Sequence, residues 1–135
     1  MKDKIIPGWV YLLYFHALYG GGKDKFCILT CVEPKTLFLL INTQPSKLKQ
    51  EQPELSECQV LIDAKSHNFL DYDSYIDCTE ALGYDINYMM QQLEADRTRI
   101  KCQLSDPILN AVIKAIENNV IPRRQIDWML KGLKK

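Results

Sequence analysis

The chain has 135 residues, of which 47% are hydrophobic and 25% charged, so it is long enough to bury a core and too apolar to stay disordered. No apolar run approaches the length that spans a bilayer, and Pro7-Gly8 breaks the run after the N-terminal charges too soon for a signal peptide. We therefore expect a single cytoplasmic domain with no membrane partner.

The charges are unevenly distributed although the net charge is zero. Residues 1–50 carry seven lysines and three acids, a net +4, and residues 51–96 carry one lysine and eleven acids, a net −10. Residues 97–135 carry nine basic residues and three acids, a net +6. Either one surface is basic while another repels anions, or folding interleaves the blocks and cancels them.

The five cysteines are widely spaced and form no CxxC pair, which gives a zinc site no support. We expect buried free thiols, with Cys27 and Cys31 on the same side of one strand. Asp71, Asp73 and Asp77 lack the spacing of an EF-hand loop and are expected to be solvated. The sequence therefore predicts no metal and no cofactor.

The first half of the chain predicts three strands. Gly8–His16 is the first, and a loop from Ala17 to Lys25 with three consecutive glycines follows it. Phe26–Val32 and Leu37–Asn42 are nearly continuous apolar runs, and the turn Glu33-Pro34-Lys35-Thr36 between them predicts an antiparallel hairpin.

The second half predicts shorter strands and more helix. Apolar residues at helical spacing indicate a helix over Tyr84–Asp96, and Ser105-Asp106-Pro107 is a capped helix start. Asn118-Asn119 would end that helix, and Pro122 would open a final amphipathic one. Short strands are expected at Val60–Ile62, Ser74–Cys78 and Thr98–Gln103. The fold class is thus mainly β with appended α-helices, a strongly bent barrel of five or six strands.

A polar cluster, Asn42-Thr43-Gln44-Pro45-Ser46-Lys47, ends the second hairpin strand. It is either an ordinary polar loop or a site held by the rigid strand. With the turn at 33–36, strand partners would have residue numbers that sum to about 69, which places Lys25 opposite Gln44 and next to Thr43. We therefore predict that Lys25 and Thr43 face each other across one groove.

The order of these pieces resembles the MazF/PemK family, the ribonuclease toxins of bacterial toxin–antitoxin modules. The resemblance covers most of residues 8–120 and departs at residues 83–96 and in the final helix. It is carried by Gly8-Trp9-Val10, Lys25-Phe26-Cys27-Ile28-Leu29, Leu39-Leu40-Ile41-Asn42-Thr43-Gln44, Tyr72-Asp73-Ser74-Tyr75-Ile76 and Lys101-Cys102-Gln103-Leu104-Ser105.

The resemblance implies an SH3-like small β-barrel of the MazF/PemK/CcdB type, with the barrel at about 8–80 and a helical part at about 84–135. It also implies a homodimer, a small antitoxin protein as partner, and metal-independent cleavage of single-stranded RNA. The family's catalytic arginine and threonine correspond to Lys25 and Thr43. Lysine offers a point charge instead of the arginine fork, so a non-catalytic barrel that binds protein or nucleic acid is the alternative.

When the 2′-hydroxyl of an RNA cleaves its own chain, cations or hydrogen-bond donors must stabilise the charge that grows on the phosphate. One group must also take the 2′-hydroxyl proton, and another must protonate the leaving oxygen. Lys25 would supply charge and Thr43 a hydrogen bond. His67 is one of two histidines, a residue type that can exchange protons near neutral pH, and it is either a part of the site or a loop histidine with no partner. The candidate RNA-binding residues are Lys23, Ser46, Lys47 and His67.

Overall fold

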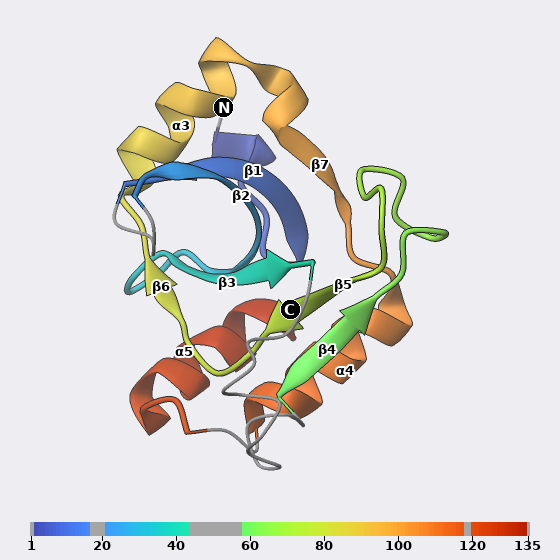
Figure 1. Cartoon of the computed structure of the whole chain (residues 1–135). Coiled ribbons are helices and arrows are strands. Elements are labelled where there is room, and N and C mark those ends of the chain that lie inside the picture. The colour runs from blue at the N-terminus through green and yellow to red at the C-terminus, as the bar shows by residue number, and fades with distance from the viewer. Residues whose placement is uncertain (1, 17–20, 44–57, 118–119, 135) are drawn as a thin grey trace.

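The computed structural model describes residues 2–16, 21–43, 58–117 and 120–134, and its centre is the predicted hairpin (Figure 1). Strands β2 (Lys23–Cys31) and β3 (Leu37–Asn42) pair antiparallel, as the two apolar runs predict. The predicted RNA-binding residues Ser46 and Lys47 lie outside the described residues, and so do Asn118-Asn119, which the sequence predicts to end a helix.

The described strands form one curled antiparallel sheet, a half-barrel, in the order β4-β5-β3-β2-β1-β7, with β6 paired to β3. Seven strands replace the five or six that the sequence predicts, because the two-residue β6 has no pattern of its own. The remaining strands are β1 (Trp9–Phe15), β4 (Gln59–Ile62), β5 (Ser74–Asp77), β6 (Leu82–Gly83) and β7 (Ile100–Gln103).

Three α-helices in the described part cover the two faces of the sheet (Figure 1). They are α3 (Ile86–Ala95), α4 (Asp106–Glu117) and α5 (Arg123–Leu133), and short 3₁₀ helices occupy Lys2–Lys4 and Arg97–Arg99. Each α-helix lies where the apolar periodicity predicts one, and the Ser105 carbonyl accepts the amide of Leu109 at the start of α4. No helix among the described residues is both long and apolar enough to cross a membrane.

The sheet separates two hydrophobic clusters. The cluster under α3 contains Tyr11, Leu13, Leu29, Met89 and Leu93. The cluster under α4 and α5 contains residues from the opposite face of the sheet and the buried residues of both helices, namely Val112, Ile116, Ile126, Met129 and Leu133. Residues that alternate along β2 and β3 therefore pack against different helices, which explains why both hairpin strands are apolar.

A bulge in β2 changes which way its side chains point. Partners sum to 67 up to Leu29–Phe38, and then Thr30 is skipped and Cys31 pairs with Leu37. Cys27 consequently lies in the α3 cluster and Cys31 in the other, so the prediction that they share one side is wrong. The predicted sum of 69 is also wrong by two.

Helix α5 approaches β2 closely at a glycine. A Cβ built on Gly132 would overlap the Thr30 carbonyl oxygen and lie 3.0 Å from Cys31 Cβ. The helix can rest on the strand only because Gly132 has no side chain.

Replacing Gly132 with alanine should therefore destabilise the fold. We expect a loss of about 1–3 kcal/mol in the free energy of unfolding, measured by urea denaturation, because overpacking outweighs the helix propensity of alanine. The control is Gly83→Ala, since a Cβ at Gly83 meets no atom within 4 Å. An unchanged or higher urea midpoint for Gly132→Ala would contradict this packing.

Candidate functional site

Lys25 and Thr43 line one pocket of about 320 Å³ at the open end of the hairpin. Lys25 comes from β2, and Thr43 follows the last residue of β3. The opposite wall is the loop before β5. Other residues that line the pocket are Asp24, Phe26, Phe69, Asp71 and Tyr72. The hairpin thus brings together the two residues that the sequence predicts across one groove.

The Lys25 ammonium donates a hydrogen bond to the Asn42 side-chain oxygen, with 2.6 Å between Nζ and Oδ1. These residues again sum to 67, so the partner of Lys25 lies two positions before the predicted Gln44. Burial lowers the pKa of Lys25, and the nearby positive charge of Lys23 lowers it further. A neutral amide orients the ammonium without cancelling its charge, which leaves that charge for an anion.

An ion pair between β2 and the 3₁₀ helix before β7 adjoins the pocket. Arg99 Nη1 lies 3.2 Å from Asp24 Oδ1 and donates a 2.9 Å hydrogen bond to the Leu12 carbonyl. Both Asp24 and Leu12 line the pocket. Arg99 therefore offsets the negative charge of Asp24 beside Lys25.

Aromatic rings form much of the pocket's side walls. Phe26 and Phe69 meet edge to face, with 4.9 Å between ring centroids, and the Lys101 ammonium lies 5.9 Å from the Phe26 centroid. Tyr72 is 72% exposed, so its ring is presented to solvent at the rim. Rings beside a lysine suit a ligand that has both flat apolar surfaces and negative charge.

His67, which the sequence predicts to bind RNA, is buried, with a side chain that is 1% exposed, and it does not line this pocket. Its Nδ1 lies 3.0 Å from the Asp63 carbonyl oxygen, and its Nε2 accepts the Ser105 amide at 3.5 Å. The ring thereby joins the loop that carries Phe69 to the start of α4. His67 positions the pocket wall and does not face the groove.

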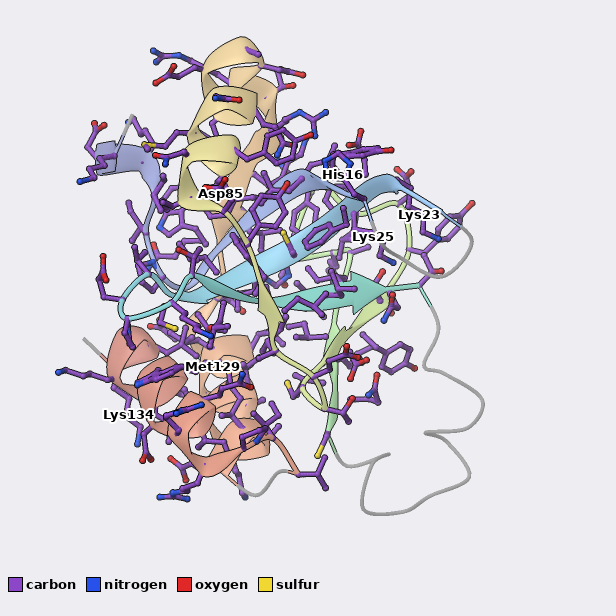
Figure 2. The ribbon with its side chains drawn as sticks, turned by 90° about the vertical axis from the view of Figure 1, so that its left-hand side faces the viewer. His16, Lys23, Lys25, Asp85, Met129 and Lys134 are labelled. Atoms are coloured by element: carbon purple, nitrogen blue, oxygen red, sulfur yellow. The ribbon has the colours of Figure 1, made fainter. Side chains whose placement is uncertain are left out.

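The other predicted residues separate into two groups. Lys23 is exposed on β2, two residues from Lys25, and Figure 2 shows both at the same end of the molecule as His16. Ser46 and Lys47 lie outside the described residues. The residues that the structure describes contain no group of three or more His, Cys, Asp or Glu side chains that could hold a metal ion.

Sequence reasoning missed Asn42, Asp71, Tyr72 and Arg99 as parts of this region. Asn42 belongs to the polar cluster, and a partner sum of 67 in place of 69 would have identified it as the partner of Lys25. Arg99 and Asp24 are 75 residues apart, and no local pattern relates them. Comparison with known proteins adds no family, since no protein-family model matches the chain and no curated protein matches its sequence.

Replacing Lys23 with alanine should raise the pKa of Lys25, because it removes a like charge that favours the neutral amine. The Lys25 ammonium loses its proton at a lower pH than an ordinary lysine, and the variant should move that loss to higher pH. The measurement is an NMR titration of the lysine side-chain carbons. Lys35→Ala, at the turn end of the hairpin, is the control and should leave Lys25 unchanged, whereas equal titration of Lys25 in all three proteins would contradict the assignment.

Proposed function

We propose that the chain is an SH3-like barrel of the MazF/PemK/CcdB type that cleaves single-stranded RNA without a metal. The observation that carries the proposal is that Lys25 and Thr43 line one pocket with exposed aromatic surface. The curled antiparallel sheet with appended helices is consistent with such a barrel. A homodimer and a small antitoxin partner belong to the same proposal.

The pocket offers a role for each part of the reaction. The 2′-oxygen attacks phosphorus, a new O–P bond forms, and the bond to the 5′-oxygen breaks, which leaves a 2′,3′-cyclic phosphate and a 5′-hydroxyl. Lys25 and Thr43 stabilise the charge that grows on the phosphate oxygens. Asp71 is an exposed carboxylate of the same pocket and takes the 2′-proton, while water protonates the leaving oxygen.

The ring of Tyr72 gives the RNA a place to stack. Base–aromatic stacking tolerates any base and needs an exposed ring face, which Tyr72 has at the rim. Asp24 would repel a phosphate, but its ion pair with Arg99 reduces that repulsion. The phosphate is therefore directed to the Lys25 side of the pocket.

The alternative is a barrel that binds RNA or protein and performs no chemistry. One observation favours it. Lys25 presents a single ammonium that already donates to Asn42, whereas an arginine would offer a planar fork to two phosphate oxygens. Cleavage and binding are therefore measured separately.

Lys25→Ala and Thr43→Ala should each lower the rate of RNA cleavage by about 10²–10³-fold, because each removes a positioned donor to the phosphate. The assay follows a labelled single-stranded RNA in excess chelator and identifies the cyclic phosphate product. Lys25→Arg should keep or raise the rate, and Lys35→Ala is the matched lysine control. If the wild-type protein leaves the RNA intact, and if the wild type and both alanine variants bind a non-cleavable RNA with the same affinity, the enzyme is ruled out and the binding module remains.

The proposed homodimer should show twice the mass of one chain in light scattering at micromolar concentration. Large apolar side chains are exposed on the surface of the single chain, among them Leu61 on β4, which is 48% exposed, and Val120, which is 66% exposed. An interface that covers such groups would stabilise the dimer. A mass of one chain at all concentrations up to the micromolar range would contradict it.

A further inference from the structure

A second pocket, of about 330 Å³, lies where the end of β1 meets β6 and the start of α3. Its lining is mainly aromatic. Tyr14, Phe15 and His16 come from β1 and the residue after it, and Tyr84 and Tyr88 from the segment that begins α3. This is the region where the sequence departs from the family it resembles, and the site described above does not use it.

Three rings of this pocket lie in one row. The rings of Tyr84 and Tyr88 are 11° from parallel with 5.9 Å between centroids, and the His16 ring continues the row at 28° and 5.3 Å from Tyr88. Tyr14 meets His16 edge to face at 4.8 Å. His16 is exposed and Tyr88 is partly exposed, so the row ends in solvent beside an open pocket.

Polar contacts fix the inner end of the row. The Tyr84 hydroxyl donates to the Tyr14 carbonyl oxygen and accepts from the Gln92 side chain. Burial raises the pKa of Tyr84 to about 12, so the phenol stays neutral at physiological pH. A Cβ at Gly22 would overlap the Tyr14 hydroxyl, so the glycine leaves room for that ring. The aromatic surface is thus held in place before any ligand arrives.

Positive charge lies next to the rings. Lys23 pairs with Phe15 across the β1–β2 ladder, and Lys25 pairs with Leu13. Since side chains alternate along a strand, both lysines point to the face of β2 that Phe15 shares. Figure 2 shows His16, Lys23 and Lys25 at one end of the molecule. Leu12 of the same strand lines the Lys25 pocket, so successive residues of β1 run from one pocket to the other.

We propose that this aromatic pocket binds a base of single-stranded RNA, stacked on the row of His16, Tyr88 and Tyr84, with the adjoining phosphate beside Lys23. The inference rests on the proposed RNA function and adds a second base-binding position on the other side of the lysines. A planar base suits a pocket with flat walls, and the lysines suit the phosphate that a base brings with it. The only carboxylate among the described lining residues, Asp85, already accepts the Asn87 amide at the start of α3.

The test measures binding of a 2′-O-methyl oligonucleotide, which cannot be cleaved, by fluorescence anisotropy. Tyr88→Ala should weaken binding about 5- to 100-fold, the range expected for one base–aromatic stack. Tyr88→Phe keeps the ring and should bind within about twofold of the wild type by the same argument. Met90→Ala, on the same helix and outside the pocket, is the control for a general effect on α3.

A scan of abasic oligonucleotides identifies the base. At one position, removal of the base should weaken binding to the wild type and leave binding to Tyr88→Ala unchanged, because both changes remove the same contact. Equal affinity of the wild type and Tyr88→Ala for every oligonucleotide would overturn the proposal, and so would equal losses for Tyr88→Ala and Met90→Ala. A protein side chain as the true occupant would give the first of these results.

The two proposals fail in different ways. RNA cleavage that depends on Lys25 but not on Tyr88, with binding also independent of Tyr88, removes the second base position and leaves the nuclease. Tyr88-dependent binding with no cleavage supports the aromatic site and removes the enzymatic chemistry.

Discussion

The hydrogen bond from the Thr30 hydroxyl to the Leu37 carbonyl, 2.8 Å long, lies at the point on which both cores depend. It sits at the bulge where β2 carries one more residue than β3. Beyond the bulge the side chains of β2 change face, so one strand supplies Leu29 to the α3 cluster and Cys31 to the cluster under α4 and α5. The buried hydroxyl has a partner, and α5 rests on the same residue through Gly132.

The second edge of β1 shows how the α3 side is completed. β7 pairs with β1 at Trp9 and Tyr11. At Tyr14 the backbone on this edge of β1 bonds to the side chains of Gln92 and Tyr84 and not to a strand. The Tyr14 amide donates to Gln92 at 2.8 Å, and its carbonyl accepts the Tyr84 hydroxyl. Buried backbone groups must find partners, so this helix attaches to the strand by polar contacts as well as by apolar packing. The same contacts orient the rings of the aromatic pocket.

Much of the fold is predictable from the sequence because local patterns determine it. Two apolar runs around a proline turn specify the β2–β3 hairpin, and a cap followed by proline specifies the start of α4. The bulge at Thr30 and the short β6 are determined by tertiary pairing, and they have no local signal. A strand pattern does not show the bulge, which lowers the partner sum from 68 to 67 and so accounts for one of the two residues by which the predicted sum of 69 is wrong. The same bulge puts Cys31 on the opposite face from Cys27.

The candidate site was predictable to a similar depth. Antiparallel pairing alone places the start of β2 beside the end of β3, which brings Lys25 and Thr43 to one pocket. The sequence does not reveal that His67 is enclosed by Asp63 and Ser105, since these contacts need the loop and α4 to meet. The arginine beside the site is likewise brought there by β7, which follows its partner strand by almost ninety residues.

The two clusters also divide four of the five thiols of the chain. Cys27 is enclosed under α3, whereas Cys31, Cys58 and Cys78 are enclosed with α4 and α5, and burial raises the pKa of Cys27 well above its usual value. A thiol in such surroundings reacts with an alkylating reagent only when the packing around it opens. The order in which these four sulfurs are alkylated under mild denaturation therefore records which half of the molecule loosens first, without any cysteine having to be introduced.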